Sequence, residues 1–301
     1  MSVSIIIVNW NSGNWLYDCI ESIKHFGGKS VKEVIVVDNA SSDGSMDTIS
    51  LDKITLIINP ENLGFAKACN IGFKAATGNY CLLLNPDTRI FENTINLSVE
   101  FLEKNQQIDI LGCRHVDKSG KTKVSCARFP KFSTFINDIF GLSKLAPDIF
   151  HPATLMTDWD HGESREVDQV MGAFMFMRKS IFDKHGFFDE QFFVYYEELD
   201  FSYRVKKNGG KIFYNADCSI YHKENGTTKN VPSFSLFLSI KSRLKFIRKH
   251  FPFYQFILLF FATITFEFLI RSLYSLFTGG WSGVKANFLG YKMLVTKYKQ
   301  Y

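Results

Sequence analysis

One carboxylate of this sequence is well placed to bind a divalent cation. Asp87 follows the apolar run 80–84 and comes directly after Pro86, which constrains the backbone that carries it. Mg²⁺ and Mn²⁺ prefer carboxylate oxygens and keep positions open for phosphate oxygens. We therefore expect Asp87 to hold such an ion against a diphosphate. The alternative is an ordinary turn, in which Thr88 caps the following helix.

A second carboxylate, Asp38, ends the β-branched run 34–37 and opens a loop rich in Ser, Asp and Gly. An acid at a strand end can accept hydrogen bonds from a base or a ribose, although it can also serve only as an Asx turn. Dinucleotide-binding enzymes place an acid here too, but they need G-x-G-x-x-G after the first strand. Residues 9–13 read NWNSG, which argues strongly against a dinucleotide cofactor.

A cluster of acids, Glu197, Glu198 and Asp200, follows the aromatic run 192–196. The aromatic side chains could wall a sugar pocket, and displacement at an anomeric carbon needs a base that deprotonates the acceptor hydroxyl. A carboxylate beside apolar walls suits this task because burial raises its pKa. In the alternative, acids at the start of a helix serve only its dipole.

A histidine, His222, ends the short predicted strand 219–222. As a metal ligand or a diphosphate contact it would complement Asp87. A lone histidine at the end of a strand is nevertheless more often structural.

These residues must be positioned by alternating strands and helices. Apolar, β-branched runs predict strands at 5–8, 34–37, 55–58 and 80–84, and helical spacing predicts helices at 15–26 and 64–76. Such an α/β pattern implies a mostly parallel sheet that is buried on both faces. The polar residues after the strands then meet at one edge, where ligands bind. They are Asn9, Asp38, Asn59 and Asp87.

The rest of the first 230 residues is less regular. We expect the segment 107–167 to form a variable region on the acceptor side. Further strands are predicted at 173–177, 211–214 and 219–222, and a helix at 197–207.

The C-terminal part, 231–301, differs in composition from the domain 1–230. The sequence from Lys223 to the end contains 12 basic and two acidic residues, so this stretch carries about +10 and the rest of the chain about −5. This charge distribution favours an anionic partner surface for the C-terminal part. Ser233 could cap a first helix. The apolar run 256–266 is interrupted by Glu267 and Arg271, which could pair on one helix face.

We therefore prefer a helix in the plane of a membrane surface over a spanning helix, because an in-plane helix tolerates charge on its water side. A buried covering helix or an oligomer contact is the alternative, and the sequence leaves the oligomeric state open. Nucleic acid is disfavoured as a partner because the tail is too apolar for a solvated arm.

The cysteines suggest a compartment. The six cysteines include no C-x-x-C pair, and several lie in apolar runs, which favours a reducing, cytosolic environment over a disulfide scaffold. Ser2 leads directly into the first predicted strand, so we expect no signal peptide. We expect the protein at the cytoplasmic face of the cell membrane, as a peripheral or monotopic protein.

Taken together, the sequence resembles glycosyltransferase family 2, especially its rhamnosyltransferase-like branch. The motifs occur in order over residues 1 to about 228, and their combination is far more specific than any one of them. They are VNWNS (8–12), VDNASSDGS (37–45), NLGFA (62–66), LNPDT (84–88), GFFDE (186–190), EELD (197–200) and His222.

The resemblance implies a GT-A nucleotide-diphospho-sugar transferase fold, inversion at the anomeric carbon and a divalent ion, Mn²⁺ or Mg²⁺. Asp87 is similar to the metal-binding acid of the family's D-x-D motif, and His222 to its late metal- or diphosphate-binding histidine. Glu198 matches the position of the catalytic base, where Asp is often found, with Glu197 and Asp200 as alternatives. Contacts with the nucleotide sugar are expected from Asn9, Asp38, Asp43, Asn62, Gly64, Asn85 and Asp200.

The resemblance also implies a reaction. A nucleotide-sugar donor would give its sugar to a lipid-linked or glycan acceptor in cell-surface polysaccharide synthesis, and the branch alone suggests dTDP-rhamnose. One alternative is a catalytically inactive nucleotide-sugar-binding scaffold at the membrane. The acids retained in the motifs argue against this alternative. A second rival, a nucleotidyltransferase, would need a Gly-rich phosphate loop with Lys or Arg after the first strand, and none is present.

Overall fold

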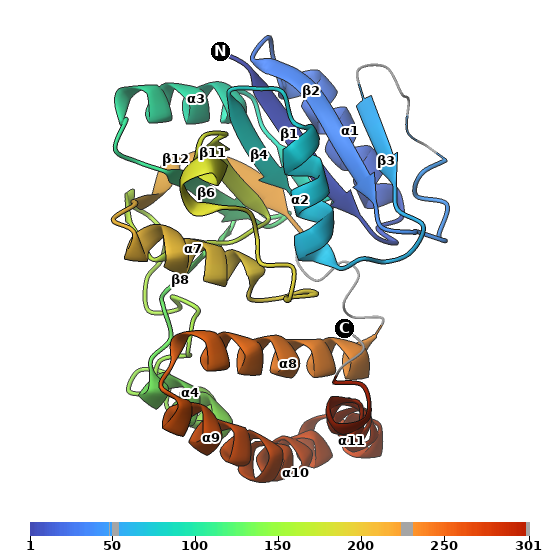
Figure 1. The fold of residues 1–301 in the computed structure, drawn as a ribbon, viewed down its shortest axis with the longest axis vertical. Helices are drawn as coiled ribbons and strands as arrows, with labels where there is room; N and C mark the ends of the chain where they lie inside the picture. The colour runs from blue at the N-terminus through green and yellow to red at the C-terminus, as the bar shows by residue number, and fades with distance from the viewer. Residues whose placement is uncertain (48, 50–53, 224–230, 299–301) are drawn as a thin grey trace.

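A computed structural model describes residues 1–47, 49, 54–223 and 231–298 (Figure 1). Its largest element is a mixed sheet in the order β3-β2-β1-β4-β11-β6-β12-β5. These strands are β1 (Val3–Asn9), β2 (Val31–Asp38), β3 (Ile54–Ile58), β4 (Tyr80–Leu84), β5 (Thr88–Ile90), β6 (Ile110–Val116), β11 (Phe174–Arg178) and β12 (Ile212–His222). β3, β2, β1 and β4 pair in parallel, as the sequence predicts, whereas β11 runs antiparallel between β4 and β6.

Helices cover both faces of this sheet (Figure 1). They are α1 (Asn14–Phe26), α2 (Phe65–Ala75), α3 (Thr94–Lys104), α6 (Ile181–His185) and α7 (Glu197–Lys207). Successive side chains of a strand point to opposite faces. In β1, Ile5 and Ile7 therefore pack with α1 and α3, whereas Ile6 and Val8 pack with α2, α6 and α7. This double burial fixes the carboxyl ends of the parallel strands, where the candidate site lies.

Two local predictions are wrong. The segments 211–214 and 219–222 form one strand, β12, whose register against β6 shifts between Asn215 and Ser219. Ser233 does not cap a helix, because it lies inside the first turn of α8 (Pro232–His250), which follows Val231. Proline suits the first helical position since its fixed φ is already helical and its missing N–H has no partner there.

The segment 107–167 contributes to both the sheet and the C-terminal tail. Its strand β6 lies within the sheet. Of four further two-residue strands, two pair with strands of this sheet and two form a separate antiparallel pair. The short strands are β7 (Thr122–Lys123), β8 (Cys126–Ala127), β9 (Arg165–Glu166) and, just beyond the segment, β10 (Gln169–Val170). Helices α4 (Phe132–Ile139) and α5 (Leu142–Leu145) pack instead on the tail, where the rings of Phe140 and Phe266 lie 5.3 Å apart.

The C-terminal tail is a layer of helices beside the sheet (Figure 1). After α8 come α9 (Phe253–Ala262), the π-helical turn η2 (Thr263–Glu267), α10 (Phe268–Thr278) and α11 (Gly280–Thr296). α8 is buried from two sides. Ser242 Oγ donates to the Val194 carbonyl at 2.7 Å on the sheet side, and Arg243 pairs with Glu267 on the other. The expected domain boundary at 230 lies in 224–230, outside the described residues.

Candidate active site

The carboxyl ends of β1 and β2 carry the first two polar residues of the expected edge. Asn9 and Asp38 are partners in the parallel register, and Asn9 Nδ2 donates to Asp38 Oδ1 at 2.8 Å. The other Asp38 oxygen accepts the backbone N–H of Ser41 at 3.0 Å. Asp38 is only 3% exposed. Its carboxylate is therefore fixed in direction and can still accept from a ligand through its remaining lone pairs.

Asp43 joins the loops that follow β1 and β2. Its carboxylate accepts the backbone N–H of Gly13 at 2.7 Å and that of Ser45 at 3.1 Å. Partial burial raises the pKa of Asp43, but the hydrogen bonds from Ser45 and Gly13 outweigh this effect and lower the pKa. The carboxylate thus stays ionised, and its exposed position leaves it accessible.

A set of side-chain amides, which the sequence analysis missed in part, extends the edge toward β3. Asn39 Nδ2 donates to Asn62 Oδ1 at 2.9 Å, and Asn39 Oδ1 accepts from Asn59 Nδ2 at 3.0 Å. Asn62 Oδ1 also accepts the N–H of Gly64 at 3.0 Å. Asn39 therefore holds the expected donor-binding loop in place. In the sequence, the position of Asn39 directly after Asp38 at the end of a strand indicates that it belongs to the site.

Gly64 allows this loop to approach the aromatic run 192–196. Its φ is +87°, and a Cβ at this position would lie 2.6 Å from the carbonyl oxygen of Phe193. The N–H of Phe65 donates to that same carbonyl at 2.6 Å. Only glycine tolerates both the backbone conformation and the contact.

Asp87 and His222 are brought together by the pairing of β5 with β12. Thr88 is the partner of His222 in the antiparallel register, and the N–H of Lys223 donates to the Asp87 carbonyl at 3.1 Å. As a result His222 Nε2 lies 3.4 Å from Asp87 Oδ1. One carboxylate and one imidazole form a donor set that suits Mn²⁺ and, less well, Mg²⁺.

The surroundings of this pair are compatible with a metal. His222 Nδ1 is buried and has no hydrogen-bond partner within the part of the chain that the structure describes. The ring of His115 stands edge-on to that of His222 at 5.2 Å. Burial, and then the neighbouring His222, lower the pKa of His115 well below its usual range, so it adds no positive charge. Among the residues that the structure describes, no cluster of three or more His, Cys, Asp or Glu could hold a metal. Two protein ligands would suit an ion whose remaining coordination positions are filled by phosphate oxygens of the substrate.

A cation that the sequence analysis did not identify also lies at this edge. Lys223 Nζ lies 3.5 Å from the ring centroid of Trp15, at the start of α1. Cation–π contacts of this kind hold the charge over the ring. No local pattern pairs these two residues, because the fold alone brings them together.

Glu197 and Glu198 begin α7 after two tyrosines with left-handed backbone. The φ angles of Tyr195 and Tyr196 are 66° and 71°, a conformation that costs about 1–2 kcal/mol for each non-glycine residue. The turn places Glu197 in the interior, where it is 2% exposed. Burial, and then the adjacent Glu198 carboxylate, raise the pKa of Glu197 well above its usual range. Glu197 therefore favours its uncharged form more strongly than an exposed glutamate does.

Glu198 is linked to the Asp87 loop through two residues. Its Oε1 lies beside Gly172, where a Cβ would be 3.5 Å away. The next residue, Ala173, accepts the N–H of Asn85 at 3.1 Å. Glu198 Oε2 is buried and has no hydrogen-bond partner among the described residues.

Asp200 does not join this arrangement. Its side chain is fully buried and lies 2.9 Å from Arg204 Nε, 2.7 Å from His250 Nε2 and 2.7 Å from Lys249 Nζ. Burial alone would raise the pKa of Asp200, but His250, Lys249 and Arg204 together lower it to about 2. The expected donor contact of Asp200 is therefore not retained. Its carboxylate joins α7 to the end of α8 instead.

The family of the chain follows from a sequence match. The profile described as "Glycosyl transferase family 2" matches residues 4–186, more than half of the chain. The chain belongs to glycosyl transferase family 2. The resemblance seen in the sequence is thereby confirmed.

Two curated relatives of this family 2 glycosyltransferase match most of its length. It is 27% identical over 251 residues to the "Low-salt glycan biosynthesis hexosyltransferase Agl10" of Haloferax volcanii, covering 80% of this chain and 74% of that protein. It is 23% identical over 261 residues to the "N-acetylglucosaminyl-diphospho-decaprenol L-rhamnosyltransferase" of Mycobacterium tuberculosis, covering 81% and 83% of the two chains.

A solved structure shares the fold. The mannosyltransferase PcManGT of Pyrobaculum calidifontis, determined with GDP-Man and Mn²⁺, superposes with a TM-score of 0.53 at 14% identity. The match covers 98% of this chain and 75% of that one. The mixed sheet with helices on both faces is the GT-A fold, as expected.

Proposed function

We propose that this family 2 glycosyltransferase transfers a hexose from a nucleotide-sugar donor to an acceptor hydroxyl with inversion at the anomeric carbon. The observation that carries the proposal is the position of three groups at one sheet edge. The Asn9–Asp38 pair ends β1 and β2. Asp87 follows β4 and lies beside His222 at the end of β12, and Glu198 is linked to the Asp87 loop through Gly172 and Ala173.

The donor lies along this edge. Asp38 accepts from the nucleoside, with Asn9 and Asp43 holding the carboxylate and its loop in position. Asn62 and Gly64 shape the adjoining wall of the donor site, and Asn85 carries the loop that presents Asp87.

Asp87 and His222 would hold Mn²⁺ or Mg²⁺ at the donor diphosphate. Such an ion would supply positive charge that stabilises the leaving nucleoside diphosphate. The Mn²⁺ found with the structurally similar mannosyltransferase supports this choice of ion.

Glu198 is the general base. Its Oε2 takes the proton of the acceptor hydroxyl, while the hydroxyl oxygen bonds to the anomeric carbon and the bond from this carbon to the diphosphate breaks. A single displacement of this kind inverts the anomeric centre. The adjacent Glu197 is buried, and its pKa is raised by this burial and by the neighbouring Glu198 carboxylate.

The acceptor is a lipid-linked saccharide or a glycan, and the tail holds the enzyme at the cytoplasmic face of the membrane. The helix Phe253–Thr278 is, by length and composition, apolar enough to cross a membrane. The mycobacterial relative, whose name specifies a diphospho-decaprenol acceptor and rhamnose, supports a lipid-linked acceptor and a dTDP-rhamnose donor.

The test is a transfer assay with a panel of nucleotide sugars, polyprenyl-diphosphate-linked saccharides and Mn²⁺. We expect one donor to be consumed and the anomeric configuration of the product, determined by NMR, to be inverted. Donor binding without turnover on any acceptor would instead identify an inactive nucleotide-sugar-binding scaffold, and retention would exclude the single displacement.

A further inference from the structure

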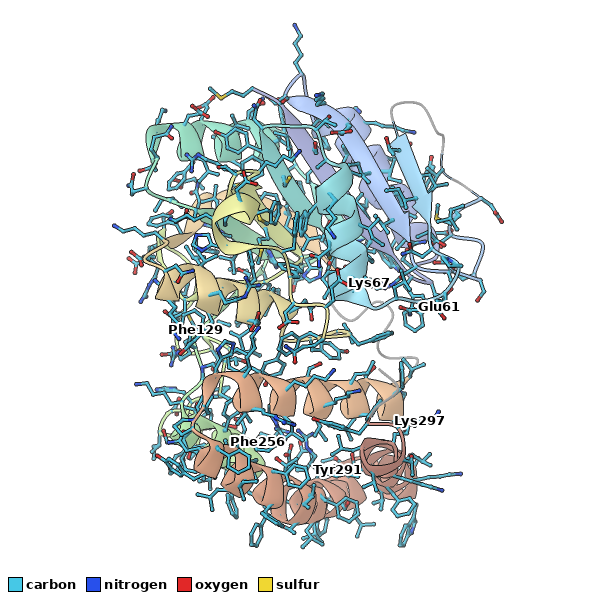
Figure 2. All side chains as sticks on the ribbon, viewed as in Figure 1. Glu61, Lys67, Phe129, Phe256, Tyr291 and Lys297 are labelled. Atoms are coloured by element: carbon cyan, nitrogen blue, oxygen red, sulfur yellow. The ribbon has the colours of Figure 1, made fainter. Side chains whose placement is uncertain are left out.

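The tail presents an apolar stripe to the outside of the molecule. Figure 2 shows side chains projecting from α9 and α10 on the side away from the sheet. The stripe consists of Leu258, Phe261, Phe266, Leu269, Leu273 and Phe277, each at least half exposed. The steps between them are three or four residues, except for the five-residue step across η2. A π-helical turn is closed by an i→i+5 hydrogen bond and so contains more residues than an α-helical turn. The longer step across η2 therefore keeps the stripe on nearly the same face.

The charges of this layer all have one sign on the outside. From Phe253 to Tyr298 the sequence contains a single acid, Glu267, which is 1% exposed. Against it stand Arg271 and the exposed Lys285, Lys292 and Lys297. An apolar stripe bordered by lysines, with no exposed acid in this part of the described chain, fits a bilayer that carries anionic head groups.

The inner side of the same helix is fixed to the rest of the protein. Glu267 accepts from Arg243 of α8 and, at 2.8 Å, from Arg271 Nε, and Arg243 also donates to Thr263 Oγ1 at 3.1 Å. In turn α8 is bonded to the sheet domain through Ser242 and Val194. If the 26-residue helix Phe253–Thr278 crossed a bilayer, this ion cluster would lie in hydrocarbon, where charges are expensive. In the plane of the surface, Glu267 faces α8 while Phe266 faces outward.

The active site lies toward the same side. β1 and β2 run toward the helical layer (Figure 1), so their carboxyl ends face it. The loop at Gly64 contacts Phe193, and the next residue, Val194, accepts from Ser242 of α8. Within the described part of the chain, α8 and the aromatic run 192–196 thus connect the donor edge to the outer helices.

We propose that α9, η2, α10 and α11 lie in one leaflet of an anionic bilayer, with the stripe buried among the lipids and the active-site edge turned toward the membrane surface. The helix Phe253–Thr278 lies parallel to that surface and does not cross. The acceptor then reaches Glu198 from the membrane as a lipid-anchored saccharide, a consequence that rests on the proposed function.

Vesicle flotation of the full chain tests the surface. Wild type floats with phosphatidylglycerol vesicles, and Leu269→Asp/Leu273→Asp reduces the bound fraction by at least about tenfold. The matched control is Leu97→Asp, an exposed leucine of α3, which floats like wild type. Flotation of the double variant at the wild-type level would overturn the proposal.

Native Trp281, 79% exposed and the one tryptophan of the tail, reports the depth. Lipids brominated near the head group quench its fluorescence more than lipids brominated at the chain ends, and the quenched component is lost in Trp281→Phe. The reverse order of quenching would contradict an in-plane position.

Cysteine labelling in cell membranes distinguishes a helix 253–278 that lies in the plane of the membrane from one that crosses it. All six native cysteines are buried, so a new exposed cysteine gives a clear signal. Ser282→Cys, beyond the end of α10, stays unlabelled by an impermeant maleimide in right-side-out vesicles, like the control Ser119→Cys in the sheet domain. Labelling of Ser282→Cys from that side would show a crossing helix.

These outcomes are independent of the proposed chemistry. Release of nucleoside diphosphate from the donor in detergent tests the reaction without a membrane. Vesicle binding without donor turnover would contradict the proposed function but not the proposed membrane surface. Donor turnover without vesicle binding would contradict the membrane surface but not the proposed function.

Discussion

His222 Nε2 lies 3.4 Å from Asp87 Oδ1, although the two residues are far apart in the sequence. The contact results from the short antiparallel pairing of β5 with β12, in which Thr88 faces His222. A donor site that depends on both residues therefore depends on this pairing, and each side chain can be replaced without removing a packed apolar group.

Replacing Glu198 by Gln should separate binding from chemistry. The amide keeps the shape of the side chain but cannot take a proton, so we expect kcat to fall by about 10²–10⁴-fold with the Kd of the donor unchanged. Turnover and donor titration measure the two quantities. The control is Glu197→Gln, which mimics the protonated neighbour and keeps most of the activity; the opposite ranking would make Glu197 the base.

Glu197 should make stability depend on pH. The pKa of Glu197 is raised in the folded state. Its contribution to the free energy of unfolding is therefore fully present below the ordinary pKa of 4.5 and is lost as pH rises from there through the raised pKa. The glutamine of Glu197→Gln cannot ionise, so the Tm of the variant minus the Tm of wild type should increase as pH rises above 4.5. Thermal unfolding at several pH values measures this difference, and a constant difference would show that Glu197 does not titrate as described.

Asp200→Asn should destabilise the protein rather than act on the donor. The substitution leaves Arg204, Lys249 and His250 without their shared anion, which costs about 3–5 kcal/mol for a buried pair. Urea unfolding measures the loss. Asp189→Asn is the matched control, because it removes a partly exposed partner of the same Lys249 and should cost no more than about 1 kcal/mol.

The acid dependence of these variants gives a second readout. The pKa of Asp200 is lowered to about 2, so its stabilisation is present above the ordinary value of 3.8 and is lost as pH falls toward 2. Wild type should lose stability over this range and Asp200→Asn should not. If both decline in parallel, the carboxylate is not held as an anion.

The sequence could predict the parts of this enzyme that depend on local pattern. The four parallel strands and α7, at 197–207, follow from periodicity, and the Asp38 and Asp87 loops follow from strand ends. Local pattern could not separate the roles of Glu198 and Asp200, which differ because α8 folds back and brings Lys249 and His250 onto Asp200.

Non-local contacts account for the other differences as well. The 211–222 region contains turn-forming residues at 215–217, yet pairing with β6 continues through a register shift. Local pattern does not single out Asn39, because its role depends on hydrogen bonds with Asn59 and Asn62, which belong to another loop.

Gly64→Ala should disturb the donor loop. A Cβ would lie 2.6 Å from the Phe193 carbonyl, and φ is +87°, so we expect a loss of more than about 1 kcal/mol in stability together with weaker donor binding. Gly120→Ala separates the two causes, since its φ is +80° but nothing lies within 4 Å of a Cβ there. Equal losses in both variants would mean that the contact with Phe193 is unimportant.

The most direct test of the account is the release of nucleoside diphosphate from a panel of nucleotide sugars, with Mn²⁺, with Mg²⁺ and with chelator, by wild type, Asp87→Asn and His222→Gln. We predict that wild type selects one donor and stops in chelator, that Asp87→Asn loses activity by at least about 100-fold, and that His222→Gln needs more Mn²⁺ for half its rate. Undiminished turnover in chelator or in Asp87→Asn would contradict the metal-dependent site at the centre of this account.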